Sequence, residues 1–201
     1  KVHIKHSPNP EYSVVYIADN GCGMSEATLE EAMRYGSGND DYGPGDLSKY
    51  GMGMKTASSW LANKWTVITS AIGEDTERTI QFNVEEVVEN DMHELIAIEK
   101  EVNPNEHYTI IKLEELTGNA PLSRDIIKIK KHLSSIYRKF LRNPDINILV
   151  NNEELVYQDQ EVLFAPKWDN ENGIPIEWKI EINQSFGTNK RVVGFIGLLS
   201  T

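Results

Sequence analysis

The sequence lacks the features of a secreted or membrane-spanning protein. It has one cysteine, Cys22, in 201 residues, so no disulfide can form within the chain. No apolar run approaches the roughly 20 residues that cross a bilayer, and no basic and apolar leader opens the chain. We therefore expect a cytoplasmic protein that does not interact with membranes.

Positive charge is also scarce. The chain carries 20 Lys and Arg against 31 Asp and Glu, a formal net charge of −11. Non-specific binding of nucleic acid depends on clustered Lys and Arg, so contact with DNA would require a local basic patch or a further segment. The histidines show no spacing typical of a metal site: they are His3, His6, His93, His107 and His132.

The first third of the chain alternates regular elements with glycine-rich segments. Residues 13–19, SVVYIAD, form a β-branched apolar run and predict a buried strand that ends in the turn DNGCGM. A helix capped by Ser25 follows, with Leu29, Ala32 and Met33 on one face. Residues 36–50 hold four glycines, a proline and three aspartates and predict a mobile loop.

A second helix is expected from Gly51, and a β-rich stretch follows it. Met54, Ala57, Ser58 and Leu61 have the spacing of a buried helix face. Trp60 and Trp65 flank the joint between this helix and the next strand and are predicted to lie in the core. The candidate strands are WTVITSA (65–71), RTIQFN (78–83), HELIAIEK (93–100) and YTIIKLEEL (108–116).

A long amphipathic helix is predicted over residues 123–142. Its apolar stripe is formed by Ile126, Ile129, Leu133, Ile136, Tyr137 and Phe140. Asn143-Pro144 ends it, and we expect a domain boundary there, which gives domains 1–143 and 144–201.

Two glycine-rich segments carry the chemistry. In the first, Asp19 ends a strand beside glycines that let a flat ligand approach the backbone. A carboxylate there can accept a hydrogen bond from the exocyclic amine of adenine, whereas guanine presents a carbonyl at that ring position. In the second, YGMGMKT (50–56), glycines precede a helix start, where backbone N–H groups can bind polyphosphate. Lys55 could add a point charge.

Each segment alone occurs in ordinary turns, but the two in this order, separated by a glycine loop, are far more specific. Other nucleotide motifs are excluded. Met54 separates Gly53 from Lys55, so no P-loop sequence is present, and neither segment contains Gly-x-Gly-x-x-Gly. The loop NDDYGPGD lacks the ligand spacing of a calcium site.

The two glycine-rich segments, IADNGCGMS and SKYGMGMKTAS, resemble the two glycine motifs of GHKL ATPases. This class includes gyrase B, MutL, MORC proteins and the heat-shock chaperone of that fold. The segments are most similar to those of the MORC group and related bacterial ATPases. The resemblance covers about the first 140 residues and implies a two-layer α/β sandwich with helices on one face of a mixed, mainly antiparallel sheet. It also implies ATP with Mg²⁺ and an ATP-dependent homodimer. By this resemblance, the adenine site is formed by Asp19, Gly21, Gly23, Met24 and Thr109. The phosphate site is formed by Gly51, Gly53, Met54 and Lys55. The lid carries Gly36, Gly38, Gly43 and Gly45.

The chain departs from the family at its beginning. The family's first motif lies on a helix before the SVVYIAD strand and supplies the glutamate that activates water and the asparagine that holds magnesium. Only KVHIKHSPNPEY precedes this strand here, and Glu11 sits in its turn, so we expect the general base to be absent and the fragment to be inactive by itself. The segment from Asp145 is similar to the start of the transducer domain, in which Lys190 is either the phosphate-sensing lysine or a solvated hairpin residue.

Three functions remain open from the sequence. The first is an ATP-driven switch, in which ATP binding closes the lid and favours dimerisation. The second is a sensor histidine kinase, which shares the pocket, although His132 follows the ATP motifs and precedes Leu133 rather than an acidic residue. The third is a non-catalytic nucleotide-binding or scaffold module. The resemblance does not distinguish DNA repair, DNA topology, chromatin, phage defence and chaperone roles.

Overall fold

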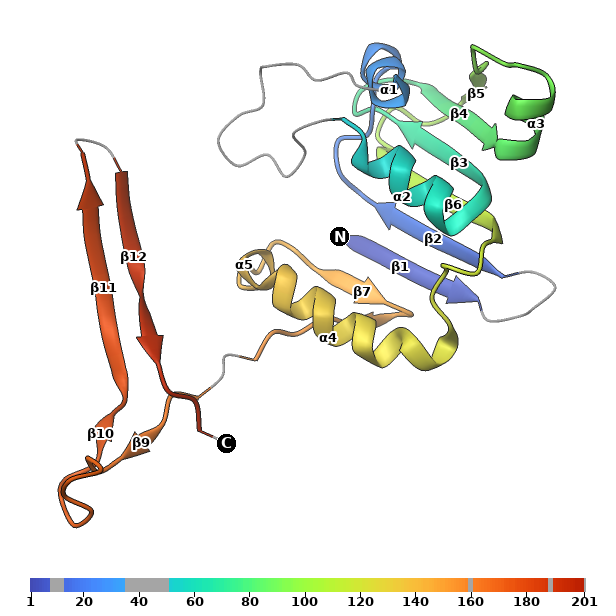
Figure 1. Cartoon of the computed structure of the whole chain (residues 1–201). Coiled ribbons are helices and arrows are strands. Elements are labelled where there is room, and N and C mark those ends of the chain that lie inside the picture. Colours follow the sequence, from blue (N-terminus) through green and yellow to red (C-terminus); the bar gives the residue numbers. More distant parts are fainter. Residues whose placement is uncertain (8–12, 35–50, 159–160, 188–189, 201) are drawn as a thin grey trace. The chain divides into compact units, whose positions relative to one another are not determined.

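The computed structural model describes residues 1–7, 13–34, 51–158, 161–187 and 190–200 (Figure 1). The expected lid glycines Gly36, Gly38, Gly43 and Gly45, and Glu11, lie outside these residues. The chain forms two compact units, Lys1–Tyr157 and Gln158–Thr201. The glycine motifs both belong to the first unit.

An eight-stranded sheet organises the first unit. All of its neighbouring strands pair antiparallel except β1 and β7, which run parallel. The mixed, mainly antiparallel sheet that the sequence implied is therefore confirmed. In spatial order its strands are β5 (Ile98–Glu101), β4 (Thr76–Asn83), β3 (Ala62–Ser70), β6 (Tyr108–Leu116), β2 (Val14–Asp19), β1 (Val2–Ser7), β7 (Ile148–Val150) and β8 (Glu153–Glu154).

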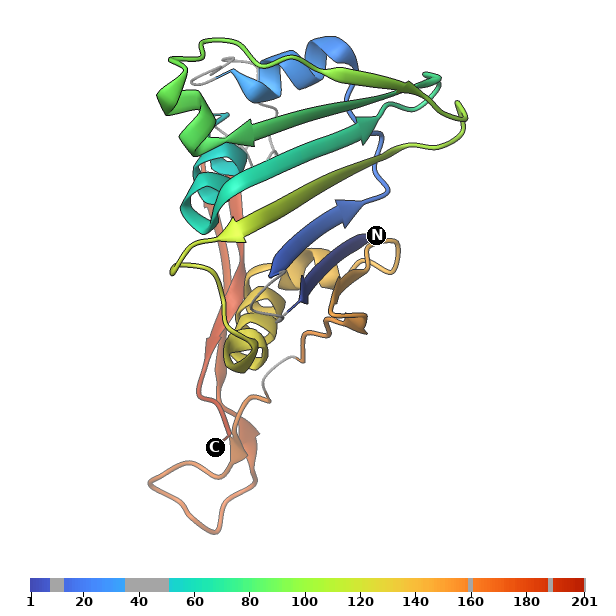
Figure 2. The ribbon, with the colours of Figure 1, turned by 90° about the vertical axis from the view of Figure 1, so that its right-hand side faces the viewer.

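Helices cover one face of this sheet (Figures 1 and 2). Leu29 from the first helix packs in one cluster with strand residues, and Ile4 of β1 contacts both this cluster and a second one that includes Leu133. The helices are α1 (Glu26–Met33), α2 (Gly53–Leu61), α3 (Val84–Glu89), the 3-10 turn η1 (Ser123–Asp125), α4 (Ile126–Ile136) and α5 (Arg138–Leu141). None of the described helices is long and apolar enough to cross a membrane.

The core lies between these helices and β3. Trp65 is 1% exposed and stacks on Phe82 of β4, with ring centroids 5.1 Å apart. Trp65 is thus a core residue, as predicted. The same prediction for Trp60 is wrong, because this side chain is 64% exposed. It projects from α2 away from the apolar stripe that Met54 and Leu61 direct at the core.

The buried face of α2 differs from the predicted one. Its fully buried residues are Lys55 and Ser58, whereas Ala57 is exposed. Met54 and Leu61 pack against the core from either side of them. Met54, Ser58 and Leu61 thus face the core as predicted, Ala57 does not, and Lys55 occupies an interior position.

The segment 123–142 is helical, but not as one continuous helix. It consists of η1, α4 and α5, with a break at Tyr137 between α4 and α5. Ile126, Leu133 and Tyr137 contact the second cluster as expected, together with Leu141, but Ile136 is exposed. Ile136 is the last residue of α4 and lies outside the contacts of this cluster.

The division between the units lies later than the expected boundary at Asn143. Parallel pairing of Val2, His3 and Ile4 with β7 makes the strand after Pro144 part of the first sheet. The chain leaves this unit only after Tyr157. The segment 93–100 also differs from prediction, since only Ile98–Glu101 forms a strand there.

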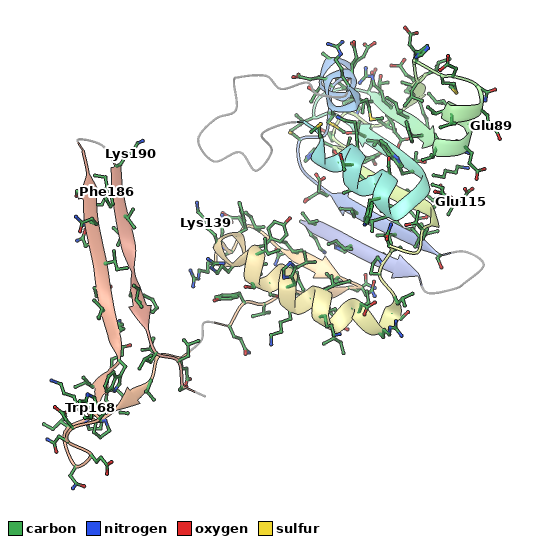
Figure 3. The ribbon with its side chains drawn as sticks, in the orientation of Figure 1. Glu89, Glu115, Lys139, Trp168, Phe186 and Lys190 are labelled. Atoms are coloured by element: carbon green, nitrogen blue, oxygen red, sulfur yellow. The ribbon has the colours of Figure 1, made fainter. Side chains whose placement is uncertain are left out.

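The second unit contains two short antiparallel pairs. These are β9 (Phe164–Ala165) with β10 (Ile176–Glu177), and β11 (Lys179–Phe186) with β12 (Lys190–Gly197). Lys190 begins β12, is exposed, and pairs with Phe186 at the tip of this hairpin (Figure 3). Its assignment as a phosphate sensor stays a prediction.

Candidate functional site

Three polar side chains form a row across the end of the helix-covered face of the sheet. Thr109 is the cross-strand partner of both Asp19 on β2 and Thr69 on β3. Directly paired residues project on the same face, and this is the face that carries Val67 and Ile111 toward the core. The family resemblance implied that Asp19 and Thr109 both belong to the adenine site, and the structure brings them together as cross-strand neighbours.

The hydroxyl of Thr69 organises this row. Its Oγ1 donates to the Tyr108 carbonyl at 2.9 Å and accepts from the Met24 N–H at 2.9 Å. Oγ1 of Thr109 lies 3.3 Å from it. Since the single Thr69 hydrogen is used by the carbonyl, the Thr109 hydroxyl is the donor in this contact. The lone pairs of Thr109 are then left to accept from a ligand or water.

Thr69 was missed by the sequence analysis. Its position within WTVITSA identified only a strand residue, and its contacts with Met24 and Thr109 depend on β3 lying beside β6. The available signal was its β-branched hydroxyl in an otherwise apolar strand, which is a weak one.

The carboxylate of Asp19 is half-buried and shapes the turn after β2. Its Oδ1 accepts from the Gly21 N–H at 2.8 Å. No described residue donates a hydrogen bond to Oδ2, so this oxygen can accept from a ligand. A Cβ on residue 21 would lie 2.7 Å from Oδ1, so glycine is required for this bond.

Further hydrogen bonds hold this turn against the sheet. The carbonyl of Cys22 accepts from Ile72 N at 2.8 Å. The carbonyl of Gly21 accepts from Nδ1 of His107 at 2.5 Å, which places a hydrogen on that ring nitrogen. Cys22 thus holds the turn through its backbone carbonyl, while its side chain is exposed.

Gly23 is fixed by its surroundings. Its φ is +68°, in the left-handed region that glycine adopts without a side-chain penalty. A Cβ there would lie 1.8 Å from the carbonyl oxygen of Ser70. The first glycine motif therefore packs directly on the end of β3, and Met24 follows with its side chain against the core.

The second glycine segment opens α2. Gly51 has a φ of +60°, Met52 is the N-cap residue, and no side chain caps the helix. The first-turn N–H groups of a helix have no partner within the helix, so Gly53, Met54 and Lys55 present theirs at its positive end. Among the described residues, no heavy atom beyond the chain neighbours and the helix's own backbone lies within 4 Å of a Cβ built on Gly53, so they leave this side of the helix start open.

The structure places the side chain of Lys55 in the interior. It is 1% exposed, and its Nζ donates to the carbonyls of Ala32, at 2.6 Å, and of Gly51. Burial lowers the pKa of this amine. The ammonium thus joins the end of α1 to the start of the phosphate motif.

Tyr108, next to Thr109, points to the opposite face of the sheet. Its hydroxyl donates to the carboxylate of Glu77, and burial, followed by this bond, raises its pKa to about 12. The folded-state pKa thus exceeds the unfolded value near 10. The contribution to stability is complete below pH 10 and is lost as the pH rises toward 12.

We therefore expect the free energy of unfolding to fall between about pH 10 and pH 12, and to fall less in Tyr108→Phe. Urea denaturation followed by circular dichroism at each pH measures this difference. Tyr16→Phe, at a more exposed position, is the control and should follow the unmodified chain. Equal slopes for the unmodified chain and Tyr108→Phe would contradict the assignment.

Comparison with known proteins is consistent with these motifs. The model of the family described as histidine kinase-, DNA gyrase B- and HSP90-like ATPase matches residues 1–109. No curated protein sequence matches the chain. The matched range contains every residue proposed for the adenine and phosphate sites.

Solved structures show the same fold. The crystal structure of the ATPase region of Saccharomyces cerevisiae topoisomerase II aligns with a TM-score of 0.53 at 12% identity, over 77% of this chain and 42% of that chain. The same region bound to ICRF-187 (dexrazoxane) aligns with a TM-score of 0.52 at 13% identity, over 77% and 42%. The chain therefore spans less than half the length of these structures.

Proposed function

The chain belongs to the family of histidine kinase-, DNA gyrase B- and HSP90-like ATPases, and on this premise we propose that its first unit binds ATP, with adenine at Asp19 and the phosphates at the start of α2. The observation that carries the proposal is the cross-strand row of Asp19, Thr109 and Thr69 beside the Gly21–Gly23 turn. The carboxylate of Asp19 and the hydroxyl of Thr109 would provide the hydrogen-bond acceptors for the base.

Adenine recognition follows from the donors and acceptors of this row. Oδ1 of Asp19 is used by the turn, so Oδ2 is the oxygen that accepts from the exocyclic amine. A water held between Asp19 and the lone pairs of Thr109 would contact a ring nitrogen. Guanine offers a carbonyl at the position of the amine, and this carbonyl would face the carboxylate without a hydrogen.

The phosphates are proposed to bind the amides at Gly51, Gly53 and Met54. The open side of Gly53 and the uncapped start of α2 support this placement. Lys55 does not extend into this space. Its role is to position the Gly51 carbonyl, and its charge acts on the phosphates through the protein interior.

Magnesium would accompany the nucleotide. The described residues include no cluster of three or more His, Cys, Asp or Glu that could hold a metal. Phosphate oxygens and water would therefore supply most of its ligands.

We further propose that the complete protein is an ATPase switch whose lid, residues 36–50, closes over ATP and favours a homodimer. Hydrolysis would depend on a general base outside the described residues. The transducer-like role of residues 144–201, and any contact with DNA, belong to the same proposal. ATP binding without turnover in the complete protein would instead indicate the non-catalytic module.

The test is the affinity for ATP with magnesium, measured by calorimetry for the chain and for Asp19→Asn. Asparagine keeps an oxygen for the Gly21 N–H but replaces the other oxygen by a donor. The asparagine N–H₂ and the adenine amine would then both be donors and could not hydrogen-bond to each other. This costs about 2 kcal/mol or more of binding free energy, so ATP affinity should fall at least about 30-fold.

Asp169→Asn is the matched control, because it makes the same chemical change at an exposed position of the second unit. It should bind ATP as the unmodified chain does, and GTP should bind weakly to all three proteins. Unchanged ATP affinity in Asp19→Asn would refute the adenine site.

A further inference from the structure

His107 connects the start of β6 to the turn after β2. It lies one residue before β6 and two before Thr109, and its Nδ1 donates to the Gly21 carbonyl, 2.5 Å away. The sequence showed only that this histidine lacks the spacing of a metal ligand. Its contact with Gly21, 86 residues away along the chain, therefore needs another explanation.

Two hydroxyl groups at the end of β3 hold the backbone on either side of His107. Oγ of Ser70 donates to the Glu106 carbonyl at 3.1 Å, and Oγ1 of Thr69 donates to the Tyr108 carbonyl at 2.9 Å. Both hydroxyl-bearing residues are 0% exposed, so water does not compete for these two bonds. The imidazole therefore extends from a backbone that is fixed on both sides.

Gly21 is bonded by a side chain on each of its polar backbone groups. Its N–H donates to Oδ1 of Asp19 at 2.8 Å, and its carbonyl accepts from His107. Within the described ranges, the Gly21 N–H is the one donor to the Asp19 carboxylate. The position of Gly21 therefore decides which carboxylate oxygen is used by the turn and which is left for a ligand.

We propose that His107 is a positioning residue of the adenine site. By holding the Gly21 carbonyl it keeps the Gly21 N–H on Oδ1 of Asp19, so that Oδ2 is aimed at the exocyclic amine. An apolar side chain could fill the space beside the turn, but it could not donate to a carbonyl. This inference rests on the proposed function, because it gives His107 a part in binding the base.

The first test concerns the ring itself and needs no nucleotide. A neutral imidazole carries one hydrogen, and the bond to Gly21 requires it on Nδ1. Long-range ¹H–¹⁵N correlation spectra at about pH 8.5, where imidazole is neutral, report which nitrogen is protonated. The signals that disappear in His107→Asn identify the ring, and we expect them to show the Nδ1–H tautomer.

The second test compares the loss of the donor with its retention. Leucine removes the donor, so calorimetry should show ATP affinity about fivefold or more lower in His107→Leu. The amide nitrogen of asparagine, like Nδ1 of histidine, is bonded to Cγ, so His107→Asn should keep the affinity within about twofold. His93→Leu makes the same change at a side chain that is 82% exposed and should bind ATP as the unmodified chain does. Urea denaturation establishes that each variant is folded.

A double-mutant cycle separates positioning from a general effect on structure. If His107 acts through the Asp19 carboxylate, its loss should matter little once that carboxylate no longer accepts from the amine. Adding His107→Leu to Asp19→Asn should therefore lower ATP affinity by less than about twofold, against about fivefold or more in the unmodified chain. A side chain that only supports the fold would give the same loss in both backgrounds.

Three results would overturn the role of His107 and leave the adenine site standing. The neutral ring could carry its hydrogen on Nε2, His107→Asn could lose as much ATP affinity as His107→Leu, or the losses in the double variant could be additive. Unchanged ATP affinity in Asp19→Asn alone is a different outcome. It would remove the adenine site and, with it, the role of His107, whereas the tautomer would still report the bond to Gly21.

Discussion

Replacing Gly23 by alanine is expected to destabilise the first unit by about 3 kcal/mol or more and to abolish ATP binding. The φ of +68° alone costs alanine about 1–2 kcal/mol. The new Cβ would also lie 1.8 Å from the Ser70 carbonyl oxygen and 2.6 Å from its carbon. These are backbone atoms of β3, so no side-chain rotation relieves the overlap.

Gly73→Ala is a matched control for this prediction. Gly73 has a φ of +82°, but no described residue other than its chain neighbours has a heavy atom within 4 Å of its added Cβ. It should therefore lose only the conformational part, about 1–2 kcal/mol, and keep its affinity for ATP. Urea denaturation and calorimetry measure both quantities, and equal losses in the two variants would show that the overlap with Ser70 is relieved elsewhere.

The sequence allowed much of this site to be predicted. The β-branched run before Asp19 and the glycines after it define a strand and a turn by local preferences alone. Thr109 was reached through the family resemblance. The structure supplies its physical basis, since the register of β2 with β6 pairs Asp19 with Thr109.

What could not be predicted depends on contacts between distant segments. Thr69 joins the row only because β3 lies next to β6 in the sheet. The observed division between the units lies after the expected one because β7, a strand after Pro144, pairs with β1 near the start of the sequence. The periodicity of a single segment does not specify the order of strands in a sheet. The role of Thr69 and the division between the units therefore could not be predicted from the sequence.

Lys55 shows the limit of hydrophobic spacing most clearly. The pattern from Met54 to Leu61 placed Ala57 on the buried face and did not include Lys55, but Ala57 is exposed and Lys55 is buried. Lysine is seldom fully buried without partners. Here it has two carbonyl acceptors, those of Ala32 and Gly51, which flank the segment 35–50. Spacing cannot reveal such acceptors.

Lys55→Met is accordingly the second change with a large expected effect. Methionine keeps the length of the side chain but leaves the two carbonyls without this donor, at about 1–3 kcal/mol for each buried group. We expect the free energy of unfolding to fall by about 2–4 kcal/mol. ATP affinity should also fall, because the Gly51 carbonyl no longer fixes the start of α2.

The pH dependence separates this role from packing alone. Burial lowers the folded-state pKa of Lys55, so the unfolded chain binds its proton more tightly. The contribution of Lys55 to stability therefore rises as the pH approaches 10.5, opposite in sign to that of Tyr108, and Lys55→Met should lack this rise. Lys100→Met, at an exposed lysine 4.0 Å from Glu77, should change stability by less than about 0.5 kcal/mol. If Lys55→Met lost stability but kept its ATP affinity, Lys55 would hold α1 to α2 without positioning the phosphate site.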